Sequence, residues 1–344
     1  AFCASAGKSS LEMVRDWAGS RVQWGLPVGQ HDAVAQMIGK MAADTFALEA
    51  LVEIIGAMSD SGDFDIRLEA AVAKLWGTET GWDLVNDALQ VRGGRGYETH
   101  GSLQARGEVS YPVERWLRDM RINTIFEGSS EIMRLFIARE AVDRHFSIAG
   151  DLVNPSASLG AKLVALVKAG LFYAWWYPTR FLGWSAWPRY HEFGSLAKHL
   201  RYVERTSRRL ARKTFHTMLR FGPGLEKRQA VLGRVVDIGS ELLVMTASVI
   251  YAKTIQQRNE DEFGAEALAD AFCRQSRRRI SASFRAVFRN DDLATYDVAQ
   301  SYLAGDLSWL EQGVISLATY RELDPLEEKS AAEDTYELEP VEAP

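Results

Sequence analysis

A glutamate between an apolar residue and a glycine is the first feature of this sequence that suggests chemistry. Glu127 follows Phe126 and precedes Gly128. A positioned carboxylate acts as a general base when a substrate proton lies within hydrogen-bond reach. Phe126 would supply an apolar wall, and Gly128 would let the backbone approach a substrate closely because it has no side chain. We therefore take Glu127 as a candidate catalytic base, with Phe126 and Gly128 as candidate substrate-binding residues.

The same segment also fits a purely structural role at the start of a helix. Ser129 and Ser130 are suitable N-cap residues, and carboxylates complement the positive end of the helix dipole. Glu131 competes with Glu127 as a base, but it falls one turn into the predicted helix. Taken alone, the segment favours the structural role, so the decision depends on the rest of the chain.

Four segments in order resemble recurrent segments of the acyl-CoA dehydrogenases. They are RVQWG at 21–25, QVRGGRGY at 90–97, VERWLRD at 113–119 and IFEGSSEIMR at 125–134. One of these segments alone would be weak evidence for the family, since glycine-rich stretches occur in many loops. The four segments together, in this order and at this spacing, are specific for it. The resemblance covers residues 1 to about 145 well and 150–325 only in general character. It is strongest to the very-long-chain branch, which shares a stretch like IRLEAAVAKLWG at 66–77 and carries an additional helical domain.

The resemblance implies a reaction in which Glu127 removes the α proton of a long-chain acyl-CoA. An α C–H of a thioester is too weakly acidic for water to ionise, so a base and stabilisation of the enolate are both needed. In the family the β hydride passes to FAD and trans-2-enoyl-CoA leaves, a step of fatty-acid β-oxidation. The electrons then go to an electron-transferring flavoprotein. The alternative from another class is a non-catalytic assembly or scaffold protein on the same fold.

The resemblance also implies which residues hold FAD. A diphosphate requires a cation and backbone N–H groups. Arg21 matches the family's pyrophosphate-binding arginine, and the other implied FAD contacts are Gln23, Trp24, Gln90, Gly94, Ser129 and Glu131. Because Gln90 and Gly94 match positions that contact the flavin of a neighbouring subunit, a homodimer or larger homo-oligomer is implied. Without the motif set, Arg21 would be a solvated cation at a helix end and Gly94 a helix C-cap.

The expected fold is all-α, with an antiparallel four-helix bundle of the acyl-CoA dehydrogenase C-terminal type at 1–150. Apolar residues recur with helical periodicity, which predicts long helices at about 9–24, 32–58, 65–91 and 129–145. A short helix is expected at 113–121. Residues 93–112 are expected to form a polar loop, whose 98–112 part is longer than the family's usual connection and receives no catalytic role.

A second helical domain is expected at 151–322, followed by an acidic disordered tail at 323–344. Helices are predicted at about 157–176, 192–221, 225–257, 262–288 and 295–322. Residues 163–187 are rich in Trp, Tyr and Phe, with only Lys168 and Arg180 charged, and 189–234 carries twelve Lys or Arg and three Glu. This pattern predicts peripheral membrane contact through 163–234. The alternative is that the aromatics form the core of the second bundle.

The bulk composition excludes several classes of protein. The 344 residues fit about two domains, and a net charge of −6 gives no case for nucleic-acid binding. Two distant cysteines disfavour a disulfide scaffold or a zinc site, and we expect no metal. The expected location is the cytoplasm or mitochondrial matrix, or peripherally on the inner membrane. The family's N-terminal helical and β-domains are not visible, and the chain begins inside a predicted helix, so we expect a portion of a larger polypeptide.

Overall fold

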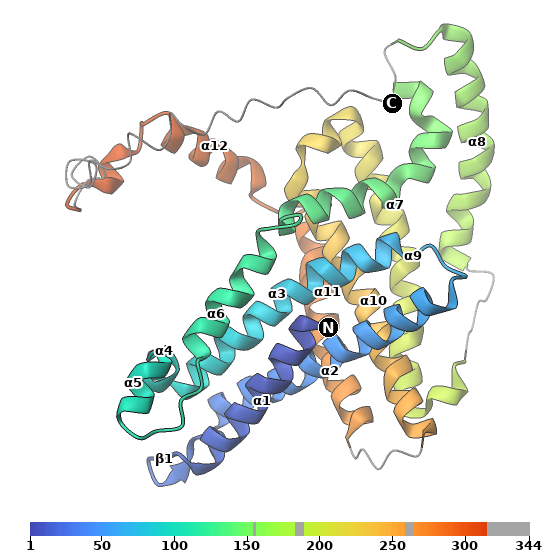
Figure 1. The fold of residues 1–344 in the computed structure, drawn as a ribbon. Helices are drawn as coiled ribbons and strands as arrows, with labels where there is room; N and C mark the ends of the chain where they lie inside the picture. Colours follow the sequence, from blue (N-terminus) through green and yellow to red (C-terminus); the bar gives the residue numbers. More distant parts are fainter. Residues whose placement is uncertain (154–155, 183–188, 259–263, 315–344) are drawn as a thin grey trace, which may run out of the picture. The chain divides into compact units, whose positions relative to one another are not determined.

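The chain folds into helices (Figure 1), and its internal contacts divide it into a first unit, Ala1–Arg289, and a second unit that begins at Asn290. The computed structural model describes residues 1–153, 156–182, 189–258 and 264–314. In these ranges the only strands are β1 (Val22–Gln23) and β2 (Leu26–Pro27), which form one antiparallel hairpin. The predicted all-α class is therefore confirmed.

Three long helices of the first unit pack against one another: α1 (Phe2–Ser20), α2 (Asp32–Ser61) and α3 (Arg67–Arg92). Helices α6 (Val113–Arg121) and α7 (Ser130–Val153) both contact α3. Apolar side chains at helical spacing fill the interior, and the fully buried ones include Met13, Val14, Met41, Leu84 and Met120. Helix α3 is thus the element that touches every part of the predicted bundle.

The first predicted helix is wrong at its C-terminal end. Helix α1 stops at Ser20, and the chain turns through the hairpin instead of continuing to residue 24. Trp24 and Gly25 form the tip, with φ of 49° and 83°. Two consecutive positive φ values match the twist of a tight two-residue hairpin, which Gly25 accommodates without strain. Periodicity alone did not reveal this turn.

The predicted polar loop at 93–112 is also wrong in part, because it contains helices α4 (Gly94–Tyr97) and α5 (His100–Ala105). The Thr99 hydroxyl caps α5 by accepting from the Ser102 backbone N–H at 3.3 Å. Leu103 is fully buried and anchors α5 to the bundle. One buried side chain in a polar segment was too small a signal to predict a helix.

Beyond residue 150, the first unit continues through α8 (Leu159–Leu182), η3 (His191–Leu196), α9 (Ala197–Phe221), η4 (Gly222–Lys227), α10 (Gln229–Gln257) and α11 (Ala265–Ala286). Helices α10 and α11 pack on each other and on α2, and α10 also contacts α7. The helices after residue 150 therefore share a core with the bundle. The division into sequence domains at residue 150 stays a prediction.

The second unit contains α12 (Asp292–Leu303) and η5 (Ser308–Glu311). Helix α12 ends earlier than the predicted helix 295–322, because Gly305 adopts a φ of 90° just beyond it. The expected tail at 323–344 lies outside the described residues.

Candidate active site

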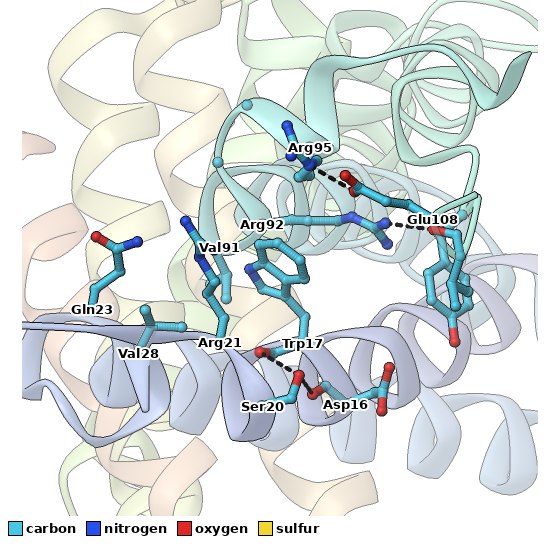
Figure 2. A pocket seen from close by; sticks show the side chains of 14 residues that line it. Asp16, Trp17, Ser20, Arg21, Gln23, Val28, Val91, Arg92, Arg95 and Glu108 are labelled. Carbon is cyan, nitrogen blue, oxygen red and sulfur yellow. Dashed lines mark hydrogen bonds and ion pairs between the residues drawn. The ribbon is translucent and has the colours of Figure 1, made fainter. Parts of the chain in front are cut away.

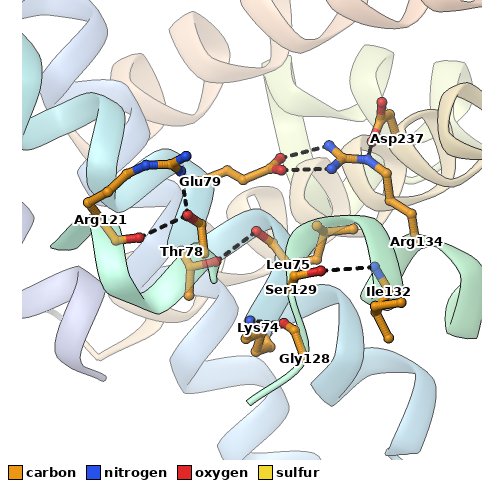
Figure 3. Close-up of polar contacts among 11 residues, drawn as sticks. Lys74, Leu75, Thr78, Glu79, Arg121, Gly128, Ser129, Ile132, Arg134 and Asp237 are labelled. Carbon is orange, nitrogen blue, oxygen red and sulfur yellow. Dashed lines mark hydrogen bonds and ion pairs between the residues drawn. The ribbon is translucent and has the colours of Figure 1, made fainter. Parts of the chain in front are cut away.

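Glu127 lies on an exposed loop between η2 (Ile122–Thr124) and α7. Figure 3 shows the end of this loop at Gly128 and Ser129. The Glu127 backbone adopts a φ of 51°, and Gly128 follows with 93°. A Cβ at position 128 would lie 2.8 Å from the Met133 sulfur, so a larger residue there would meet both strain and a close contact. Gly128 is therefore required by the conformation of the loop, in addition to the close approach of a substrate that the sequence suggests.

Side chains from both flanks and from α3 hold this loop. Arg121 Nη1 donates to Thr124 Oγ1 at 2.6 Å, and the Ser129 hydroxyl caps α7 by accepting from the Ile132 N–H at 3.4 Å. Lys74 Nζ donates to the carbonyl oxygens of Phe126, at 3.3 Å, and of Gly128. The loop that carries Glu127 is therefore fixed at both ends and in its middle.

The two glutamates of the segment differ in their suitability as a base. Hydrogen bonds from its own backbone N–H and from the Ser129 hydroxyl hold the pKa of Glu131 below its usual value. A carboxylate with a lowered pKa is a poorer proton acceptor. This supports Glu127 over Glu131, and it leaves Glu131 and Ser129, two of the implied FAD contacts, together at the start of α7.

Large apolar side chains are exposed on both sides of Glu127. Ile125 is 53% exposed and Phe126 44%, while Ile132 and Phe136 on α7 are 58% and 39% exposed. Ile132 and Phe136 are four residues apart, so they lie on one face of the helix. Clustered apolar exposure of this kind marks a surface that contacts a ligand or another part of a protein.

A pocket of about 610 Å³ lies at the far end of α3 (Figure 2). It brings together three predicted FAD contacts, Arg21, Gln23 and Gly94, from the end of α1, the hairpin and the start of α4. With the Gln23 amide oriented toward Arg21, its oxygen accepts from Arg21 Nη2 at 2.7 Å. The pocket is also lined by Asp16, Trp17, Ser20, Val28, Val91, Arg92, Gly93, Arg95, Glu108, Val109 and Tyr111.

Arg92 is the residue of this pocket that sequence reasoning missed. Its side chain is 4% exposed and lies between Trp17 and Tyr111, with the guanidinium carbon 5.4 and 5.0 Å from the two ring centres. Nη2 donates to the Val109 carbonyl at 2.8 Å, whereas Nε and Nη1 are buried without a hydrogen-bond partner. Burial lowers the pKa of Arg92. An arginine in the last turn of a helix is common, because a cation there complements the helix dipole, so no local pattern marked Arg92 as a pocket residue.

Ion pairs attach the 98–112 segment to the pocket. Arg95 contacts Glu98 at 3.1 Å and Glu108 at 2.7 Å, and Arg106 contacts the same two carboxylates at 2.6 and 3.6 Å. Glu108, Val109 and Tyr111 thereby form one wall. The segment to which no role was assigned is thus part of the pocket that contains Arg21.

Two predicted FAD contacts do not line this pocket. Gln90 is exposed near the end of α3. Trp24 is 90% exposed at the hairpin tip, and the described part of the chain gives its ring one edge contact, with His31 at 5.8 Å. A tryptophan exposed to this degree has nearly its whole apolar surface available to a ligand or another chain.

The predicted residues therefore form two clusters, the Glu127 loop and the Arg92 pocket. Lys74, which contacts the loop, and Arg92 both lie on α3. Their separation along the helix axis is roughly 27 Å, from the rise per residue of an α-helix. The Glu127 loop and the Arg92 pocket therefore lie beside different parts of the same helix.

Comparison with known proteins identifies the family to which the bundle belongs. Residues 1–142 match the family model described as acyl-CoA dehydrogenase, C-terminal domain. These residues belong to the acyl-CoA dehydrogenase family. The probable acyl-CoA dehydrogenase FadE10 of Mycobacterium tuberculosis is 50% identical, and the match covers 92% of this chain and 49% of that protein. The mitochondrial very long-chain specific acyl-CoA dehydrogenase of Macaca fascicularis is 25% identical, over 87% of this chain and 44% of its own length.

A solved acyl-CoA dehydrogenase has the same fold. The crystal structure of the Bacillus anthracis acyl-CoA dehydrogenase complexed with FAD superposes with a TM-score of 0.61, at 20% identity, over 86% of this chain and 49% of that one. The similarity extends beyond the bundle, since residues 1–142 are well under 86% of the chain. The chain spans about half the length of the curated relatives that it matches.

Proposed function

We propose that this chain is the C-terminal part of an FAD-dependent acyl-CoA dehydrogenase that acts on long-chain acyl-CoA. The observation that carries the proposal is the family match of residues 1–142 together with Glu127 on an exposed, braced loop. The exposed apolar side chains beside it, Phe126, Ile132 and Phe136, give an acyl thioester an apolar surface to contact. The activity that we propose is that of the whole protein.

Glu127 takes the α proton of the thioester in this proposal. Water cannot remove that proton at neutral pH, so the carboxylate has to be held within hydrogen-bond reach of it. The backbone N–H of Glu127 is the group of this chain that would donate to the thioester oxygen as negative charge develops there. The family's N-terminal and β-domains would cover the apolar surface and exclude water.

The Arg92 pocket fits the diphosphate part of FAD, the group that supplies the hydride acceptor when it is bound. Arg21 and Arg92 both lie over the Trp17 ring, at 5.9 and 5.4 Å, so two cations share one wall. The unpaired Nε and Nη1 of Arg92 are buried donors that an anion would satisfy. The volume of the pocket lies within the usual range for small-molecule sites. We also propose Gln90 and Gly94 as contacts to a flavin held by a second copy, Trp24 as a further flavin contact, and an electron-transferring flavoprotein as acceptor.

Reduction of the flavin by substrate tests the proposed function. The full-length native protein should purify yellow, and long-chain acyl-CoA should bleach it under anaerobic conditions. Glu127→Gln should slow bleaching by at least 10²-fold, the usual contribution of a general base. Glu140→Gln is the matched control, because Glu140 is an exposed carboxylate further along α7 with no assigned role, and it should keep the bleaching rate within a few-fold. A colourless protein, or one that acyl-CoA never bleaches, would favour the scaffold alternative.

We further propose that α8 contacts a membrane surface. Of the described helices, two are long and apolar enough to cross a membrane, Leu159–Phe181 and Gln229–Gln257. The second is 67% buried and belongs to the core, whereas the first is only 11% buried. Four exposed residues of α8 recur every fourth position and form a stripe: Leu163, Val167, Leu171 and Trp175, each at least 58% exposed. Pro178 within the helix, and Trp175 on the stripe, favour the bilayer interface.

The cations of α9 contribute less to this surface than the sequence suggested. Arg209 and Arg212 lie 4.2 Å from the ring centres of Phe284 and Phe181, and Lys213 lies 4.8 Å from that of Phe288. Their charges are therefore partly engaged within the fold. The exposed apolar stripe of α8, rather than net charge, supports peripheral attachment.

Liposome flotation tests the membrane proposal. The native protein should float with vesicles containing anionic lipid, and Leu163→Glu with Leu171→Glu should abolish flotation, because two charges would enter the apolar interface. Phe64→Glu is the control, since Phe64 is 57% exposed outside α8. No flotation of the unchanged protein at low salt would contradict attachment. If the protein instead forms larger particles that the double variant disperses, the stripe contacts a second copy.

A further inference from the structure

The backbone at Glu127 is held in a conformation that a glutamate does not favour. A φ of 51° lies in the left-handed region, which is unfavourable for a residue with a side chain because Cβ then comes close to the following carbonyl oxygen. Such conformations persist where the surrounding structure imposes them, and they concentrate at functional sites. The contacts that impose this one identify the residues that aim the Glu127 carboxylate.

Lys74 makes those contacts from the neighbouring helix α3. Its Nζ donates to the carbonyl oxygens of Phe126 and Gly128, the residues directly before and after Glu127. Figure 3 shows Lys74 beside Gly128. The two acceptors lie 52 and 54 positions away in the sequence. Hydrogen bonds from an ammonium group are stronger than those between neutral partners. One side chain thus holds the peptide groups on both sides of the proposed base.

Other contacts hold the ends of the loop but not its middle. Arg121 contacts Thr124 before the loop, and Ser129 caps α7 after it. The backbone N–H groups of Ile125 and Phe126 both bond to the Ile122 carbonyl. Within the part of the chain that the structure describes, the hydrogen bonds accepted by the Phe126 and Gly128 carbonyls come from Lys74.

We propose that Lys74 is the positioning residue of the proposed catalytic base, and this inference rests on the proposed function. By holding two carbonyls at once, Lys74 fixes the left-handed turn at Glu127 and so the direction in which the carboxylate leaves the backbone. Proton transfer depends steeply on this geometry, because a misplacement of about 1 Å costs on the order of 10²-fold in rate. Lys74 itself touches neither substrate nor flavin in this assignment.

Two substitutions of Lys74 separate positioning from general stability. Lys74→Met keeps the length and apolar stem of the side chain but removes the donor, and Lys74→Arg keeps a charged donor. Lys8→Met is the matched control, since Lys8 lies on α1 of the same bundle and pairs with the Glu49 side chain. All four proteins are compared as the full native polypeptide with FAD bound.

Thermal melting checks the stability of each protein, and three further measurements are made on each: the rate of anaerobic flavin reduction, the affinity for acyl-CoA, and amide hydrogen exchange of residues 125–128. Lys74→Met should reduce the flavin on the order of 10–10²-fold more slowly. Its acyl-CoA affinity and melting temperature should change little, and exchange at 125–128 should become faster. Lys74→Arg should recover part of the rate and of the protection, and Lys8→Met should match the unchanged protein in all three.

The proposal is overturned if Lys74→Met keeps the original rate, or if its rate falls without faster exchange at 125–128. It is also overturned if the melting temperature and acyl-CoA affinity fall together with the rate, or if Lys74→Arg recovers neither rate nor protection. Failure of the proposed function gives a different result, since acyl-CoA would then not bleach even the unchanged protein.

Discussion

At the scale of single residues, Arg92 is a buried cation whose guanidinium lies between the rings of Trp17 and Tyr111, close to the candidate flavin contact Arg21. The sequence motifs themselves contain Glu127, Ser129 and Arg21, so these candidates could be predicted without a structure. Arg92 could not be predicted in this way, because its importance depends on Trp17 and Tyr111, which are remote in sequence and reach it only through packing. Lys74 lies in the stretch 66–77, whose resemblance the sequence shows. Its contact with the Glu127 loop forms only on folding, because the two segments are more than 50 positions apart in the sequence. Motifs thus predict reactive groups better than the groups that hold them.

Arg92 gives a prediction in which ligand affinity and stability change in opposite directions. Arg92→Met removes a cation whose two buried donors lack partners, so the FAD-free protein should melt at an equal or higher temperature. FAD affinity should fall by about 10–10²-fold, since a charge-assisted contact to a phosphate is worth about 1.5–3 kcal/mol. Thermal melting and titration of flavin fluorescence measure both effects. Arg67→Met, at an exposed pair with Asp65, is the control. Unchanged FAD affinity in Arg92→Met would remove Arg92 from the flavin site.

At the scale of elements, periodicity predicted the long helices and failed at their connections. The predicted 32–58 and 65–91 correspond closely to α2 and α3, because a sustained apolar stripe over many turns has few other interpretations. The hairpin at Trp24 and helix α5 depend instead on one or two residues with special geometry or burial. Helix α7 runs beyond the predicted residue 145, to Val153. Packing on α8, which no local pattern reports, accompanies this extension.

Arg134 joins three of these elements and predicts a measurable loss of stability. On α7, it contacts Glu79 of α3 through two hydrogen bonds of 2.7 and 2.8 Å and Asp237 of α10 at 2.8 Å (Figure 3). Burial raises the pKa of Asp237, so loss of its cation would leave a poorly solvated carboxylate. Arg134→Met should therefore cost about 2 kcal/mol, below the range for fully buried pairs because the site is partly exposed.

Denaturant unfolding at neutral pH measures this cost. Arg118→Met is the control, because Arg118 is 81% exposed and its 3.5 Å contact with Glu114 lies within one helix. That variant should unfold within about 0.5 kcal/mol of the original protein. Equal midpoints for Arg134→Met and the original protein would show that the three helices are held by apolar packing alone.

At the scale of the whole molecule, the two clusters on α3 bear on how a flavin site is assembled. The resemblance implies that each flavin contacts two subunits, and the separation of the Glu127 loop from the Arg92 pocket along α3 is compatible with that arrangement. The assembly could not be predicted from the residues of one chain, because it depends on contacts between two copies. Exposed Trp24 is the side chain best placed to report it, since nearly all of its surface is free in the described chain.

Mixed dimers distinguish a shared site from one built within a chain. Arg21→Ala should impair flavin binding and Glu127→Gln should impair proton removal, so each variant alone should be nearly inactive. In a two-fold dimer with shared sites, a mixed pair carries one site with both residues intact and one with neither. Random co-assembly of the two variants, expressed together with different tags, should therefore restore roughly one quarter of the original bleaching activity, half of the dimers being mixed and half of their sites intact. If every site lies within one chain, the mixture should show only the average of the two inactive parents, because no pairing could then bring Arg21 of one chain to Glu127 of the other.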